Sequence, residues 1–139
     1  MQKSAWIVTI AMFIAVPAAA QTGFPNLRGT WKGDSESIVA DAGNAHHPGA
    51  ANSGTRLDSV TFTMKIDQQD GRRVSGTYSS QRATEPIIGV ISRTGAIHFV
   101  DTDGYATGAL LGPDRLEMCY LQIGPAARVA SCTEMTRQP

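Results

Sequence analysis

The chain has 139 residues, 42% of them hydrophobic and 17% charged, and its twelve basic residues balance twelve acidic ones. A chain with no net charge and no block of like charges lacks the basic surface that nucleic acids bind, so nucleic-acid binding is not expected. Glycine is abundant and helical spacing is absent after residue 20. The composition therefore favours an all-β domain.

The first 20 residues have the pattern of an export signal. Lys3 precedes the apolar run Ala5–Val16, and Ala18-Ala19-Ala20 supplies small residues for cleavage. The run is too short to span a membrane. We predict cleavage after Ala20 and one mature domain over residues 21–139, roughly 120 residues long. Such a protein is exported, to a periplasm or out of the cell, and has no membrane span.

The next segments alternate strand patterns with turn signals. A first strand is predicted over 35–40, and the polar stretch 41–54 is predicted to be a long loop. Val60, Phe62, Met64 and Ile66 alternate with polar residues, which indicates a half-buried strand because side chains two apart share a face. Asp70-Gly71 predicts a type I′ hairpin turn, with a partner strand over 74–79.

Five further strands are predicted, over 87–92, 96–102, 105–110, 116–123 and 128–135. The segment 87–92 is apolar almost throughout and is expected to be covered on both faces. Eight strands joined by short turns predict an antiparallel up-and-down meander that closes into a small barrel. A two-layer sandwich is the alternative.

The two cysteines of the chain lie on either side of the last predicted turn. Cys119 and Cys132 are symmetric about Gly124-Pro125-Ala126-Ala127, which places them opposite each other in a hairpin. Opposed residues in an antiparallel pair are close enough for a disulfide, and export leads to an oxidising compartment. We predict that they form a structural disulfide.

Two short motifs resemble those of a known family. Gly29-Thr30-Trp31 resembles the Gly-x-Trp motif on the first strand of avidins and lipocalins, and Gly76-Thr77-Tyr78-Ser79-Ser80 resembles the Gly-Thr-Tyr-x-Ser strand of streptavidin. The chain is thus similar to the avidin and streptavidin family of calycin barrels. The resemblance implies that Trp31 plugs one end of the barrel, with Gly29 and Gly33 leaving room for its ring.

The same resemblance implies a set of pocket residues. Tyr78 and Ser80 would point into the barrel and bond a ligand, with Ser35 or Ser37 as partners from the first strand. Only Trp31 remains as a tryptophan after cleavage, and the last strand lacks streptavidin's acidic residue. The resemblance therefore implies the fold and not biotin binding.

Other polar motifs have simpler interpretations. His46-His47-Pro48 lies in the polar loop 41–54 and is expected to be exposed and dispensable for folding. A metal site would need a further ligand such as His98 or Asp101. Asp101-Thr102-Asp103-Gly104 is typical of a hairpin turn and lacks the later ligands of a calcium loop. No catalytic or cofactor motif is present, so neither an enzyme nor a cofactor is expected.

These observations favour a binding module for a small, mostly apolar ligand held in the barrel, with Trp31, Tyr78 and Ser80 as contacts. The alternative is a protein-interaction module, such as an inhibitor or envelope accessory factor, whose interior is filled by side chains. A metal-dependent enzyme, resting on His46 and His47 alone, ranks third. A large cavity beneath Trp31 and Tyr78 would favour the first hypothesis, and a packed interior the second.

Overall fold

A computed structural model describes residues 23–49 and 54–139, and the predicted signal and its cleavage site lie outside these ranges. Within the ranges the regular structure is entirely β, with no helix that could cross a membrane. The strands are β1 Gly29–Asp41, β2 Thr55–Asp58, β3 Thr61–Asp70, β4 Arg73–Ser79, β5 Thr84–Ile91, β6 Ile97–Val100, β7 Tyr105–Gly112, β8 Arg115–Ile123 and β9 Ala127–Arg137.

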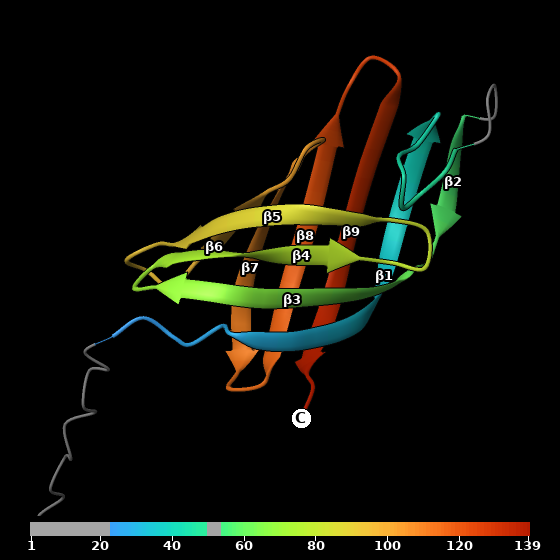
Figure 1. The fold of residues 1–139 in the computed structure, drawn as a ribbon. Coiled ribbons are helices and arrows are strands. Elements are labelled where there is room, and N and C mark those ends of the chain that lie inside the picture. The colour runs from blue at the N-terminus through green and yellow to red at the C-terminus, as the bar shows by residue number, and fades with distance from the viewer. Residues whose placement is uncertain (1–22, 50–53) are drawn as a thin grey trace, which may run out of the picture.

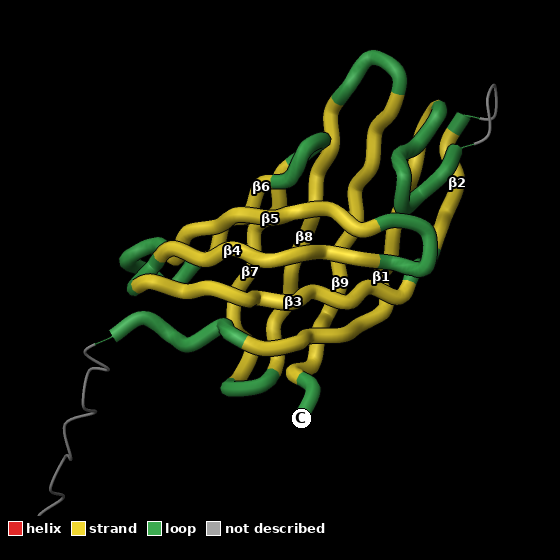
Figure 2. The backbone as a smooth tube through the Cα atoms, in the orientation of Figure 1, coloured by secondary structure: helices red, strands yellow, loops and turns green. Residues whose placement is uncertain are grey.

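The strands form one antiparallel meander that closes on itself. β1 and β3 to β9 pair in sequence order, and β9 pairs back onto β1, so eight strands complete a barrel. β3 pairs with residues 29–34 of β1, and the short strand β2 pairs with residues 37–40 of β1 on the same side. Figure 1 shows β3, β4 and β5 crossing β7, β8 and β9 steeply, with β1 bending between the two layers. The same path is traced as a tube in Figure 2. The predicted up-and-down barrel is confirmed.

Alternating side chains fill the interior of the barrel. On β3, Phe62, Met64 and Ile66 are at most 2% exposed, while the residues between them face outward. Inward residues of the other strands join them in one apolar core. The periodicity of this strand was visible in the sequence because one of its faces is buried and the other is solvated.

Trp31 closes one end of the barrel. Its side chain has no exposed surface, and its indole Nε1–H donates to the carbonyl oxygen of Leu27 at 2.9 Å. The guanidinium carbon of Arg137 lies 4.1 Å from the centre of the ring system. The predicted burial of Trp31 is confirmed. Gly33 does not make room for the Trp31 ring as expected. It allows the backbone of β9 to approach β1, because a Cβ at Gly33 would clash with the carbonyl oxygen of Glu134.

Two strand predictions need correction. β1 begins at Gly29 rather than at residue 35, because it pairs with β3 from Gly29 opposite Ile66 onward. The strand predicted to be covered on both faces is covered on one, since Ile88 is 61% and Val90 43% exposed on the outer wall of β5. β2 was not predicted, because its four residues contain one apolar side chain, and Leu57 is itself exposed.

The turn between β3 and β4 also differs from the prediction. Asp70 and Arg73 pair across the strands, so Gly71 and Arg72 are the central residues of the turn. Gly71 has a φ of +57°, whereas Asp41 is the one non-glycine residue in the described ranges with positive φ. A type I′ turn needs positive φ at both central positions, so that prediction is wrong.

The predicted disulfide is present. Cys119 and Cys132 are directly opposed on β8 and β9, their Cα atoms are 4.0 Å apart, and their sulfurs are bonded. The disulfide links β8 to β9, and β9 is the strand that closes the barrel by pairing with β1. It is a structural crosslink on the outer wall.

Candidate functional site

The loop after β1 folds into the barrel mouth, at the end away from Trp31. His46 and His47 are 5% and 2% exposed, so the expectation that they lie exposed is wrong. The Asn44 side-chain oxygen accepts hydrogen bonds from the N–H groups of His46 and His47, and the Asn44 N–H donates to the His47 carbonyl oxygen. This tight turn directs both imidazoles inward. Polar contacts, together with packing of both imidazoles against Phe62, offset the entropy of ordering the loop.

His46 lies among polar and aromatic groups from β3, β4 and β5. Its Nδ1 is 2.9 Å from the hydroxyl of Ser80, and its Nε2 is 3.2 Å from a carboxylate oxygen of Glu85. The rings of Phe62 and Tyr78 meet the imidazole edge-on, with centroids 5.2 and 6.0 Å away. Among the described residues, no partner forms a well-aligned hydrogen bond with the buried Nε2.

His47 pairs with a different acid. Its Nδ1 lies 3.0 Å from Asp58, which also lies 3.3 Å from the guanidinium of Arg56. Burial lowers the pKa of His47 and outweighs the opposing effect of the Asp58 carboxylate. Burial alone would raise the pKa of Asp58, but hydrogen bonds from His47 and Arg56 bring it below its usual value. A neutral His47 therefore donates its Nδ1–H to an ionised Asp58.

Hydroxyl groups line the barrel beneath the two histidines. Ser37 lies 3.0 Å from Ser35 and 2.7 Å from Ser131, and Ser35 also accepts the N–H of Val60. Burial is the main reason why the pKa of the Tyr78 hydroxyl is raised far above its usual value. These serines are at most 7% exposed and satisfy one another, so the polar groups need no ligand to compensate their burial.

The remaining space at the mouth is small. The void beside His46 and His47, also lined by Phe62, Tyr78 and Tyr120, has a volume of about 20 Å³. That volume holds about one water molecule. Among the residues that the structure describes, side chains fill the barrel interior around this void, which is the condition that favours the interaction hypothesis over ligand storage.

The structure gathers four of the five predicted pocket residues near the mouth. Ser35, Ser37 and Tyr78 face the interior there, and Ser80 lies at the rim against His46. Trp31 is at the opposite end and does not belong to this group. Sequence reasoning missed Phe62, Asp58 and Glu85 as partners of the histidines. The alternating pattern of β3 marked Phe62 as inward, but nothing in the sequence linked the two acids to the loop.

The Asp101–Gly104 motif is a turn, as predicted. The Asp101 carboxylate accepts the N–H groups of Asp103 and Gly104, which closes the connection between β6 and β7. Tyr120 lies next to this turn, and its hydroxyl has a raised pKa, first because of burial and then because of Asp101, Asp103 and Glu85. No three His, Cys, Asp or Glu side chains in residues 23–49 and 54–139 gather as a metal site.

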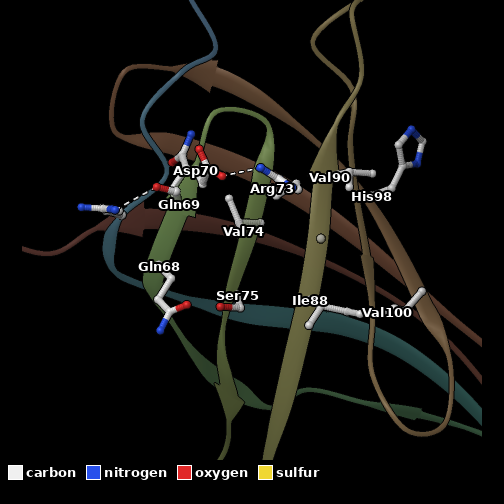
Figure 3. A pocket seen from close by; sticks show the side chains of 12 residues that line it. Gln68, Gln69, Asp70, Arg73, Val74, Ser75, Ile88, Val90, His98 and Val100 are labelled. Atoms are coloured by element: carbon white, nitrogen blue, oxygen red, sulfur yellow. Dashed lines mark hydrogen bonds and ion pairs between the residues drawn. The ribbon is translucent and has the colours of Figure 1, made fainter.

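A second feature lies on the outer wall of β3 to β6. Two cross-strand rows face outward there, and in the described ranges they contribute to a groove of about 670 Å³ (Figure 3). One row runs Gln68, Ser75, Ile88, Val100 and the other Asp70, Arg73, Val90, His98. The apolar members Ile88, Val90 and Val100 are 43–61% exposed. His98 is therefore an outer-wall residue, remote in the fold from the loop histidines.

Arg28, the residue just before β1, also lines the groove. The Gln69 side chain accepts the N–H of Leu27 and donates to the carbonyl oxygen of Pro25. The guanidinium of Arg28 donates to the backbone oxygen of Gln69 at 2.8 Å. These bonds fix the segment beside the β3–β4 hairpin and leave Arg28 among the residues that line the groove.

Comparison of the chain with family models, curated proteins and solved structures gave no match.

Proposed function

We propose that the mature protein is an exported binding module that engages another polypeptide through the groove on its outer wall. The observation that carries this proposal is the filled interior. One end is plugged by Trp31, the other holds His46 and His47, and the void between the mouth side chains is about 20 Å³. A barrel filled in this way has its recognition surface outside.

The chemistry of the groove indicates what the partner carries. Ile88, Val90 and Val100 offer an apolar floor, which matches the apolar core of protein interfaces. Arg28 and Arg73 stand at the rim against a single carboxylate, Asp70, which is already paired with Arg73. The excess positive charge favours a segment with an acidic residue beside its apolar anchor. An open groove on a barrel wall covers little of a small molecule, so an extended polypeptide fits better.

The relation to avidin-like calycins is part of the same proposal. Burial of Trp31 at a closed barrel end supports it, and so does the position of Tyr78, Ser35 and Ser37 on inward faces. The imidazole of His46 lies against Ser80 and Tyr78, the residues to which the resemblance assigns contact with a ligand. We therefore propose that this chain shares the avidin-like barrel scaffold but does not bind a ligand inside it.

Selection from a display library of random peptides tests the proposed function. We expect enriched peptides in which an apolar residue neighbours Asp or Glu. Ile88→Asp should weaken their binding at least tenfold, about 1.4 kcal/mol, because it places a charge on the apolar floor. Ile123→Asp on β8, outside the groove lining, is the matched control, and both sites are solvent-exposed, so the melting temperature should stay unchanged.

Two results would contradict the proposal. One is selected peptides that bind the Ile88→Asp variant as well as the wild type. The other is a small molecule retained in the barrel, detected by native mass spectrometry of protein purified from its own host.

A further inference from the structure

Three residues distant in sequence lie in close polar contact in one line at the barrel rim, with one hydrogen bond, between Ser80 and His46. Ser80 follows β4, His46 comes from the loop after β1, and Glu85 lies on β5. The Ser80 Oγ to His46 Nδ1 distance is 2.9 Å, and the His46 Nε2 to Glu85 Oε2 distance is 3.2 Å. A hydroxyl, an imidazole and a carboxylate in this order are the parts of an activated nucleophile.

The Glu85 carboxylate favours one tautomer of His46. The backbone N–H of Arg82 donates to Ser80 Oγ at 3.1 Å, which leaves this hydroxyl able to donate or accept toward Nδ1 of His46. A carboxylate oxygen 3.2 Å from Nε2 attracts a proton on that nitrogen. A neutral imidazole with its proton on Nε2 accepts at Nδ1, and this is the form that can take a proton from Ser80.

The geometry points to Ser80 as the nucleophile of an acyl-transfer reaction on small carboxylic esters, with His46 as general base and Glu85 as the residue that positions His46. Ser80 Oγ attacks the ester carbonyl carbon while its proton passes to Nδ1. The bond to the leaving alcohol then breaks, and the alcohol takes the proton from His46. Water repeats the sequence on the acyl-serine, releases the acid and restores the hydroxyl, so the sum is ester hydrolysis.

Access to Ser80 sets the size of the substrate. Ser80 is half-buried, and the two residues that follow it, Gln81 and Arg82, line a recess of about 200 Å³. The guanidinium of Arg82 donates one bond, to the His46 carbonyl oxygen, among the contacts of the described chain. A guanidinium has five N–H groups, so Arg82 retains donors for the charge that develops on the carbonyl oxygen. This recess, rather than the void of about 20 Å³ at the barrel mouth, is where we place a compact acyl group.

Labelling with diisopropyl fluorophosphate tests this inference on the mature, disulfide-bonded chain. Attack forms an Oγ–phosphorus bond and expels fluoride, and the adduct is located by intact mass and peptide mapping. We expect one adduct, on Ser80, and slow hydrolysis of p-nitrophenyl acetate that Ser80→Ala abolishes. His46→Gln should lower the labelling rate constant by about 100-fold or more, as loss of a general base does. Ser79→Ala is the matched control, because Ser79 donates to the Thr63 carbonyl oxygen instead.

A pH profile separates a chemical role from a structural one. The labelling rate should rise with pH, because only a neutral imidazole can accept the Ser80 proton. The charged or titratable groups around His46 are Glu85, Tyr78, Tyr120, Asp101, His47 and Arg82. Glu85→Gln should lower the labelling rate across the profile, because the carboxylate that positions the imidazole at Nε2 is lost.

The outcomes that would overturn the inference are distinct. No adduct on Ser80 of the wild type, or equal labelling of the His46→Gln variant with an unchanged melting temperature, would show that the three residues only hold the loop. An adduct on Ser79 would have the same meaning. If His46→Gln does not fold, Glu85→Gln decides, since a labelling profile unchanged by that variant also rejects the assignment.

Discussion

Replacing Trp31 with alanine tests how the closed end holds the barrel together. The side chain is fully buried, and truncation of such a residue typically destabilises a core by about 3–5 kcal/mol. The change also removes the donor that satisfies the carbonyl oxygen of Leu27, a residue with no exposed surface, for about 1 kcal/mol more. The contact with the Arg137 guanidinium is lost as well. We therefore expect a loss near the upper end of that range, about 4–5 kcal/mol.

This loss is large compared with the stability of a single domain, which is about 5–15 kcal/mol. At roughly 4 °C per kcal/mol for a domain of this size, the melting temperature should fall by about 15–20 °C. Far-UV circular dichroism with urea or heat is the suitable assay, because Trp31 is the one tryptophan of residues 21–139 and its removal abolishes the fluorescence signal.

Trp31→Phe separates the ring from the hydrogen bond. Phenylalanine keeps most of the apolar contact but cannot donate to Leu27, so it should cost about 1–2 kcal/mol. Thr107→Ala, on the outer face of β7, should change stability by less than about 0.5 kcal/mol. If the free energy of unfolding of Trp31→Ala differs from that of the wild type by less than about 1 kcal/mol, Trp31 is not the residue that closes this end of the barrel.

Four other predictions concern the covalent and ionic features of the chain. Replacing both Cys119 and Cys132 with serine should lower the free energy of unfolding by up to about 3 kcal/mol, because the bridge closes a short loop with a sequence separation of 13; urea unfolding with and without reductant measures this. Burial lowers the pKa of His47 in the folded state, so folding favours its neutral form. The free energy of unfolding should therefore fall as the pH drops below about 6.5. In His47→Gln, the free energy of unfolding should depend less on pH between about pH 7 and 5. Hydrogen bonds to Asp58 keep its folded pKa low, so a further loss should occur only at pH values below about 4, visible as an acid transition that Asp58→Asn removes. N-terminal sequencing of the exported protein should begin at Gln21, and a chain that still begins at Met1 would contradict cleavage after Ala20.

The barrel was predictable because its signals are local. Alternation along Phe62, Met64 and Ile66 reports a strand with one buried face, and the spacing of Cys119 and Cys132 reports the register of the last hairpin. Both are properties of neighbouring residues. The sequence predicts the position of the turn at Gly71 correctly but not its turn type. The turn type depends on which residues pair across the turn, here Asp70 and Arg73.

The mouth was not predictable in the same way. The loop carrying His46 and His47 contains few apolar residues, and a polar loop is ordinarily solvated. The polar partners of the loop histidines are Ser80, Glu85 and Asp58. These residues come close to the loop only after the barrel has closed. A single sequence holds no local pattern for contacts made across so many intervening residues.

The pairing of β1 with β9 has a consequence for how the chain folds. Residues of Gly29–Asp41 pair with residues of Ala127–Arg137, so the two ends of the domain complete one seam. Such distant contacts are slow to form, because loop-closure entropy is lost before the contacts compensate it. A chain emerging from a ribosome or an export channel therefore holds its first strand without its closing partner until the last residues arrive. Delivery of the C-terminal strand, rather than any earlier hairpin, is the event that commits this barrel to its folded state.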